Sequence, residues 1–136
     1  MMNKDHSPKS LAGIKVLDLS RILAGPYATQ LFADLGADVV KVENPDGGDD
    51  TRRWGPPFTT KVDGSRGDAV YFSACNRNKR SITVDFHKQA GVKLLRNLAN
   101  KADIIVENFK PGSLQKYGLD YASISANNPR IIYCSI

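Results

Sequence analysis

Positively charged side chains gather in two short segments of the chain, where they could bind phosphate groups. Arg77, Lys79 and Arg80 lie within four residues of one another, and Arg52 is followed by Arg53. Guanidinium and ammonium groups make charge-assisted hydrogen bonds with phosphate oxygens, but charged side chains are mostly solvent-exposed. The residues alone therefore favour a solvated loop for Arg77, Lys79 and Arg80, with a phosphate site as the alternative. The same two interpretations stay open for Arg52 and Arg53.

A few other side chains could take part in chemistry. Asn108 is the most suggestive, because it follows an apolar run and precedes a Pro-Gly turn, where it could bind a ligand or cap the turn. His87 also follows a β-like run, although a surface histidine is the default interpretation. Cys75 has no histidine at the spacing of a nucleophilic pair, which favours a small semi-buried residue. Cys134 lies in an apolar run and is expected in the core.

The composition excludes several classes of protein. Hydrophobic residues make up 41% of the 136 residues and charged residues 24%, which is typical of globular domains and argues against disorder. No apolar run approaches the roughly 20 residues that a membrane span needs. Because His6 and His87 are the only histidines and no CxxC or HExxH motif occurs, no metal site is expected. Two cysteines do not make a disulfide framework, which favours a reducing compartment.

The hydrophobic pattern predicts strands that alternate with helices. Apolar and β-branched runs predict strands over residues 13–20, 38–43, 81–86, 103–107 and 131–135. Helical spacing and helix-start residues predict helices over residues 26–35, 88–100, 114–117 and 121–127. This order predicts an α/β fold with a Rossmann-like, doubly wound and mostly parallel sheet.

Two segments are expected to lie outside this pattern. Residues 1–10 are polar and predict a flexible tail. Residues 44–68 hold eight glycines and prolines and predict a long loop, which in a compact domain is usually functional or disordered. Trp54 and Phe58 favour a loop that packs against the rest of the protein.

The predicted sheet places four segments at one edge. Ligands of open parallel sheets bind at the carboxyl ends of the strands, which here lead into residues 20–25, 44–49, 86–88 and 108–112. These segments offer backbone amides, asparagines and cations, which suit an anionic, nucleotide-like ligand. The three-glycine fingerprint of dinucleotide binding is absent, and Glu43 at a strand end is too weak a signal to indicate NAD. The net charge of +5 suits such a ligand at least as well as nucleic acid, because no basic helix with interleaved aromatic residues occurs.

Five motifs in order carry a resemblance to a known family. They read LAGIKVLDLS with AGP over residues 11–26, DLGADVVKVE over 34–43, NRNKRSI over 76–82, VENFKPG over 106–112 and NPR over 128–130. Together they resemble the family III CoA-transferases, the CaiB/BaiF family, from Leu11 to Ile136. The segment GDDTR with WGPP, over residues 48–57, is most similar to the succinyl-CoA:glutarate CoA-transferase branch.

The resemblance implies where coenzyme A or acyl-CoA, the substrate, would bind. By position, the family's CoA contacts fall on ten residues: Leu23, Asn44, Val84, Asp85, Phe86, His87, Asn108, Phe109, Lys110 and Lys116. Some family members have Gln in place of Leu23, Arg in place of Asn44, Lys in place of His87 and Arg in place of Lys116. His87 and Lys116 can still donate hydrogen bonds.

The resemblance also implies a reaction in which CoA moves between an acyl-CoA, here succinyl-CoA, and a carboxylic acid through an aspartyl intermediate. No aspartate of the chain matches the motif of the family's nucleophile, so no catalytic residue is assigned and we expect it beyond Ile136. Residues 11–136 are then the truncated N-terminal part of the large Rossmann-like domain. Such a fragment is expected to be inactive alone and aggregation-prone or unfolded.

The expected partners are an acyl-CoA, a small carboxylic acid and a second copy of the chain, because family members form interlocked homodimers. No nucleic-acid or membrane partner is expected. The N-terminal segment carries no clear targeting signal, so a cytoplasmic location is expected, or a mitochondrial one in a eukaryote. The acceptor acid is not indicated.

Two other functions stay open. An α-methylacyl-CoA racemase, from the same superfamily, tends to show RGKRS and EPF where this chain has NRNKRS and ENF, which favours the transferase. The second alternative is a non-catalytic CoA- or nucleotide-binding isoform.

Overall fold

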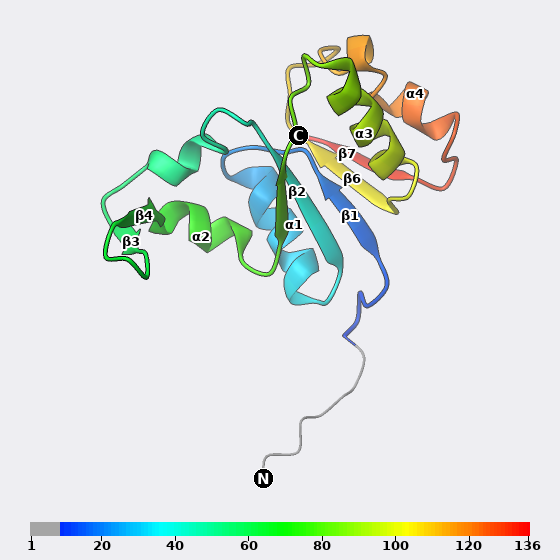
Figure 1. Cartoon of the computed structure of the whole chain (residues 1–136). Coiled ribbons are helices and arrows are strands. Elements are labelled where there is room, and N and C mark those ends of the chain that lie inside the picture. Colours follow the sequence, from blue (N-terminus) through cyan, green and yellow to red (C-terminus); the bar gives the residue numbers. More distant parts are fainter. Residues whose placement is uncertain (1–8) are drawn as a thin grey trace.

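A parallel five-stranded sheet forms the centre of the molecule (Figure 1). The computed structural model describes residues 9–136, so the expected tail over residues 1–10 falls almost wholly outside the described part. The sheet consists of β1 (Lys15–Asp18), β2 (Asp38–Glu43), β5 (Arg80–Thr83), β6 (Ile104–Glu107) and β7 (Ile132–Ser135). Their order is β5-β2-β1-β6-β7, so the strand order reverses between β1 and β6. The predicted α/β, doubly wound fold is confirmed.

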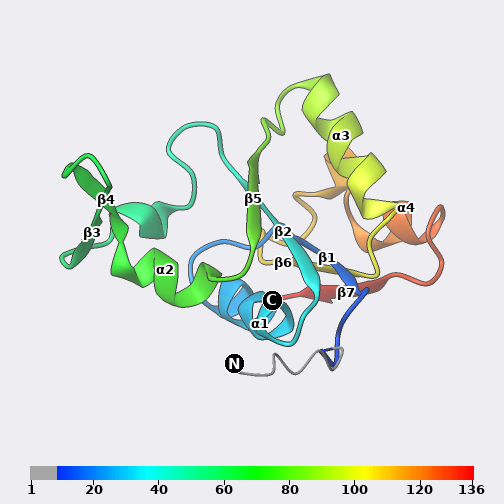
Figure 2. The same cartoon turned by 60° about the horizontal axis from the view of Figure 1, so that its bottom comes forward.

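Helices cover both faces of this sheet (Figures 1 and 2). One face carries α1 (Ala24–Asp34) and α2 (Val70–Asn76), and the other carries α3 (Gln89–Ala99) and α4 (Tyr121–Ser125). Two 3₁₀ turns, η1 (Asp50–Arg53) and η2 (Gln115–Tyr117), lie in the connections. All helices in the described residues are short, and none is long and apolar enough to cross a membrane.

Two glycines let the chain turn closely around β1 and β2. A Cβ atom on Gly25 would lie 2.3 Å from the Ser20 side chain, so only glycine lets α1 begin so close to the end of β1. Gly36 follows α1 with a φ of +100°, a conformation that glycine adopts without steric cost. The helix therefore ends where the sequence predicts, and the chain enters β2 at Asp38.

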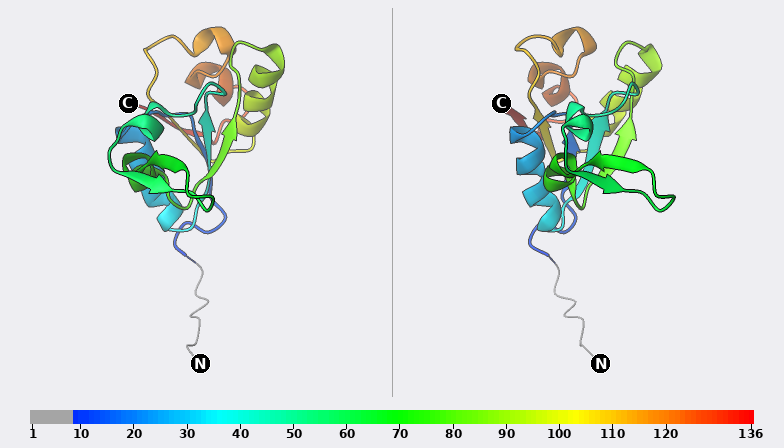
Figure 3. Two further views of the ribbon diagram at one scale, coloured as in Figure 1. Left: turned by 60° about the vertical axis from the view of Figure 1, so that its left-hand side comes forward. Right: turned by 90° about the vertical axis from the view of Figure 1, so that its left-hand side faces the viewer.

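The segment expected to be a long loop contains more structure than predicted. After η1, an antiparallel hairpin forms from β3 (Phe58–Thr60) and β4 (Arg66–Ala69), and α2 follows it directly. In Figure 3 this hairpin extends away from the five-stranded sheet. The prediction failed because β3 is largely exposed and shows no apolar alternation. Aromatic packing anchors the region as expected, with the Trp54 and Tyr71 rings 5.6 Å apart.

Two smaller predictions were also wrong. The strand expected over residues 81–86 ends at Thr83, because the Asp85 carboxylate accepts a hydrogen bond from His87 N at 2.8 Å and turns the chain. Cys134 was expected in the core but is exposed, because β7 lies at the edge of the sheet. Cys75 is buried, as its small apolar character suggested, and burial raises the pKa of its thiol.

Candidate functional site

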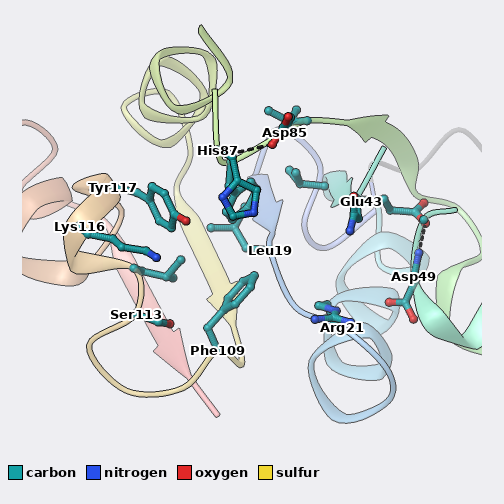
Figure 4. A pocket seen from close by; sticks show the side chains of 16 residues that line it. Leu19, Arg21, Glu43, Asp49, Asp85, His87, Phe109, Ser113, Lys116 and Tyr117 are labelled. Atoms are coloured by element: carbon teal, nitrogen blue, oxygen red, sulfur yellow. Dashed lines mark hydrogen bonds between the residues drawn. The ribbon is translucent and has the colours of Figure 1, made fainter. Parts of the chain in front are cut away.

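A cavity of about 310 Å³ opens at the carboxyl ends of β1, β2, β5 and β6 (Figure 4). It lies beside the point where the strand order reverses, which is where open parallel sheets bind ligands. Its lining comes from the segments that follow all four strands and from η2. The edge that the sequence indicated is therefore hollowed in the structure.

Seven of the ten residues predicted to contact CoA line this cavity: Asn44, Val84, Asp85, Phe86, His87, Phe109 and Lys116. The other three do not line it. Leu23 precedes α1 and is 46% exposed, and Lys110 is exposed in the segment after β6. Asn108 lies next to Phe109, but its side-chain amide is bonded to the backbone of Arg21.

One half of the cavity is aromatic. The Phe86 ring lies 5.8 Å from that of Phe109 and 5.9 Å from that of Tyr117. Val84 and Leu114 add apolar surface, and both are buried. Such a wall suits one face of a planar ring, which gains from both burial and ring packing.

Polar groups surround the aromatic half. The Lys116 ammonium lies 4.8 Å from the centroid of the Tyr117 ring, and the exposed His87 side chain also lines the cavity (Figure 4). The hydroxyl of Ser113 is buried and, among the described residues, has no hydrogen-bond partner. A buried hydroxyl without a partner is costly, so this atom is available to a polar group of a ligand.

Glu43, at the end of β2, is engaged within the protein. Its carboxylate makes two hydrogen bonds with Arg52, at 2.7 and 2.6 Å, and accepts others from Asp49 N and the Ser81 hydroxyl. Burial opposes its ionisation, but the hydrogen bonds from Arg52 and Ser81 hold its pKa below the ordinary value. These contacts leave the side chain little capacity to hold a ribose.

Asp49 forms a second buried ion pair beside the cavity. Its carboxylate lies 2.9 Å from the Lys41 ammonium, and both side chains are 1% exposed. Thr51 donates to it through the backbone N–H at 3.0 Å and the hydroxyl at 2.7 Å. Despite the burial, the Lys41 charge and the Thr51 hydrogen bonds lower its pKa to about 2, so it stays ionised.

The cluster of Arg77, Lys79 and Arg80 is solvated at Arg77 and Arg80, as the residues favoured, but not at Lys79. Arg77 pairs with Asp34 at 2.6 Å and Arg80 with Asp38 at 2.7 Å on the surface. Lys79 is 1% exposed and pairs with Asp18 at 3.0 Å beneath α1. Burial lowers the pKa of Lys79, and the Asp18 carboxylate opposes this change.

The arginines of the other basic segment are also paired. Arg52 contacts Glu43 and Asp68, and its guanidinium lies 3.7 Å from the centroid of the Phe72 ring. Arg53 pairs with Asp50 on the surface. These contacts hold the segment after β2 in place.

Nine of the sixteen lining residues were not among the predicted contacts, including the polar residues Arg21, Asp49, Ser113 and Tyr117. Arg21 and Asp49 lie within segments assigned to the ligand edge, and Tyr117 within a predicted helical piece, so their positions carried a signal. No sequence signal pointed to Ser113. No group of three or more potential metal ligands occurs among residues 9–136.

Comparisons with known proteins point to one family. A family model described as CoA-transferase family III matches residues 11–136. The chain is 56% identical over its whole length to a succinate–glutarate CoA-transferase of Agrobacterium fabrum, of which it covers 34%. It is 50% identical over 128 residues, 94% of its length, to a succinyl-CoA:glutarate CoA-transferase of Homo sapiens, of which it covers 28%. The chain thus spans about a third of the length of these relatives.

Solved structures agree. A CaiB/BaiF family protein from Brucella suis matches with a TM-score of 0.89 and 58% identity, over 95% of this chain and 33% of that one. Rv3272 from Mycobacterium tuberculosis matches with a TM-score of 0.82 and 38% identity, over 95% and 35% of the respective chains.

Proposed function

The chain belongs to CoA-transferase family III, and we propose that the complete protein moves CoA from succinyl-CoA to a second carboxylic acid, with glutarate as the first candidate. Relatives that match over nearly the whole chain are named for succinyl-CoA or succinate together with glutarate, mesaconate or L-malate. Succinate is common to these names while the second acid varies. We therefore propose the succinyl donor for the whole group and glutarate on the basis of the higher identities.

The observation that carries this proposal is the aromatic cavity at the sheet edge. Its wall of Phe86, Phe109 and Tyr117 suits the adenine ring of CoA. Lys116 and His87 stand beside this wall and suit the phosphates. We propose that these residues and the other predicted contacts, Leu23, Asn44, Val84, Asp85, Asn108 and Lys110, form the CoA-binding surface.

The chemistry itself is proposed to need a residue outside these 136. Asp18 is buried against Lys79 and Thr29, and Asp49 against Lys41 and Thr51, so neither carboxylate is free to attack a thioester. We propose that residues 11–136 form the N-terminal part of the large CoA-binding domain. The aspartate nucleophile then comes from the remainder of the complete protein, which acts as an interlocked homodimer and needs no metal.

The test is CoA exchange by the complete protein. Purified protein is incubated with succinyl-CoA and glutarate, and glutaryl-CoA is measured by chromatography. Formation of glutaryl-CoA with release of succinate supports the proposal. No exchange across a panel of acyl-CoA donors and carboxylic acids contradicts it, and inversion of an α-methylacyl-CoA without acceptor would indicate a racemase.

A pair of lysine variants tests the site. Lys116→Met removes a cation beside the aromatic wall, and we expect the dissociation constant of CoA to rise about tenfold, as for one lost charged hydrogen bond. Lys101→Met removes an exposed lysine that does not line the cavity and should leave binding unchanged. Equal binding by both variants would place the phosphates elsewhere.

A further inference from the structure

The turn after β1 has an unusual backbone conformation. Ile22 has a φ of +71°, in the left-handed region that β-branched residues rarely adopt. Such a conformation persists only when neighbouring groups hold it, and it occurs most often at functional sites. Ile22 follows Arg21, which lines the cavity, and precedes Leu23, a predicted CoA contact.

Asn108 holds this turn from the side of β6. Its side-chain oxygen accepts a hydrogen bond from Arg21 N at 2.8 Å, and its side-chain nitrogen donates to Arg21 O at 2.8 Å. The parallel pairing of β1 with β6 extends to Leu19 N, which donates to Val106 O. The Asn108 amide therefore continues the pairing across the point where the two strands separate.

Asp49 holds the turn from the side of β2. Its carboxylate accepts a hydrogen bond from Ile22 N at 3.1 Å, the next amide along the chain. Lys41 pairs with this carboxylate and also donates a hydrogen bond to Ser20 O at 3.0 Å. Both members of the buried ion pair are therefore bonded to the turn. Two neighbouring amides and two carbonyls, on residues 20–22, are thus bonded to side chains from two other strand ends.

We propose that Asn108 and Asp49 are positioning residues, which hold the Arg21–Ile22 turn in its left-handed form so that the Arg21 side chain faces the CoA site. This inference rests on the proposed function. Arg21 is the group that the turn presents: its side chain is 52% exposed and, among residues 9–136, pairs only with the part-exposed Asp50. Exposed pairs of this kind exchange readily, so an anionic group of the ligand can replace Asp50. The Asn108 side chain acts through the backbone of Arg21, to which both of its polar atoms are bonded.

The test compares two asparagines with matched bonding. Asn108→Leu keeps the size of the side chain and removes both bonds to Arg21. Asn128→Leu is the control, because the Asn128 side chain also makes two hydrogen bonds to backbone, with Ala99 O and Ala102 O. These bonds lie where β6 and β7 begin, at the edge of the sheet opposite the cavity. Asp49→Asn is a second variant that weakens the turn from its other side.

Three measurements are made on the complete protein: trypsin cleavage, titration with CoA, and KM and kcat in the CoA-exchange assay. Trypsin cleavage after Arg21, followed by mass spectrometry without ligand, reports whether the turn has loosened. Titration calorimetry with CoA reports what the turn does for the site. We expect Asn108→Leu to accelerate this cleavage and raise the CoA dissociation constant about tenfold, as for two lost hydrogen bonds, with kcat less affected than KM. Asp49→Asn should act in the same direction and Asn128→Leu should change neither quantity.

The outcomes separate this inference from the proposed function. Unchanged cleavage in both Asn108→Leu and Asp49→Asn overturns the positioning role of these residues, whether or not CoA binds. Faster cleavage with unchanged CoA affinity shows a turn that does not serve the site and also overturns it. If Asn128→Leu weakens CoA binding as much as Asn108→Leu, the weaker binding comes from general destabilisation of the protein, and the positioning role is overturned. Absence of CoA binding in the unmodified protein contradicts the proposed function, and with it the role of the turn at a CoA site.

Discussion

The two faces of the central sheet are built in different ways. Side chains of a strand alternate between the faces, so one strand contributes to both. Leu17 and Leu19 of the β1 segment face α3 and α4 and join an apolar cluster with Leu95. Asp18, between them, faces α1 and accepts hydrogen bonds from Thr29 and Lys79. In β2, Val42 joins the apolar cluster, while its neighbours Lys41 and Glu43 are buried in ion pairs on the other side.

The two faces contribute differently to the molecule. Apolar packing is not directional, so the face under α3 and α4 stabilises the fold without specifying where a loop must lie. Hydrogen bonds and ion pairs are directional, and two charged residues of the other face, Lys41 and Glu43, are bonded to segments that follow strands. Lys41 binds Ser20 O and Asp49, and Glu43 binds Arg52. The charged face therefore positions the edge of the site.

Removing one charge from the buried pair should cost the most. Lys41→Met keeps most of the volume but leaves the Asp49 carboxylate, 1% exposed, without its counter-ion. We expect a loss of about 4 kcal/mol in the free energy of unfolding, measured by urea denaturation of the complete protein. Lys15→Met, at an exposed lysine of β1, should cost less than about 0.5 kcal/mol. A similarly small loss for Lys41→Met would mean that this ion pair does not stabilise the charged face, which would then depend on its apolar cluster of Val16, Ala33, Ala37 and Val39.

A cavity in the apolar face should reduce the free energy of unfolding somewhat less. Leu95→Ala removes a side chain that is fully buried in the apolar cluster, and we expect a loss of about 3 kcal/mol. Leu94→Ala is the matched control, because Leu94, the neighbour of Leu95 on α3, is 46% exposed and its removal should cost under about 1 kcal/mol. CoA affinity should be retained by both variants. If Leu95→Ala abolished CoA binding while the protein stayed folded, the division of labour between the faces would be wrong.

Acid should weaken the charged face before the apolar one. The folded pKa of Asp49 is about 2, below the value of about 3.9 in an unfolded chain. Because the folded value is the lower one, the stability from this group is present above about pH 4 and is lost as the pH falls towards 2. The amount is about 2 kcal/mol. Between pH 5 and 2, the unfolding temperature of Asp49→Asn should fall less steeply than that of the unmodified protein. Parallel curves would contradict this assignment.

The apolar face accounts for most of what the sequence predicts. The runs that become β1, β2 and β6 are buried and β-branched, and the spacing of Leu95 and Ala99 marks a helix that packs on them. Once the five strands of the sheet are predicted, the rule for parallel sheets indicates which edge binds the ligand, without any knowledge of contacts. The hairpin β3–β4 lacks a buried apolar pattern, and nearly all of it falls in the segment predicted as a loop, residues 44–68. The short α2, Val70–Asn76, was not predicted as a helix.

The charged face could not be predicted from local pattern. The basic segment around Lys79 predicts a surface residue, but the burial of Lys79 depends on Asp18, 61 residues away in the chain. Asn108 was recognised as unusual, but its role depends on Arg21, 87 residues away. Ile22 carries no sequence signal at all, because nothing in its neighbours demands a left-handed conformation. The CoA contacts inferred from family resemblance remain predictions, and seven of the ten line the cavity.

The smallest effect should come from the residue next to Lys79. Arg80 pairs with Asp38 at 2.7 Å, closer than the 3.0 Å of the buried Lys79–Asp18 pair, but these two side chains are 67% and 49% exposed. Exposed pairs are screened by water and salt, so Arg80→Gln should cost about 0.5 kcal/mol and nothing measurable in 0.5 M salt. Lys79→Gln should cost several times more at either salt concentration, because Asp18 is shielded from water and cannot exchange its partner for an ion in solution. Equal costs at these adjacent positions would mean that proximity, rather than burial, sets the strength of the pairs on the charged face.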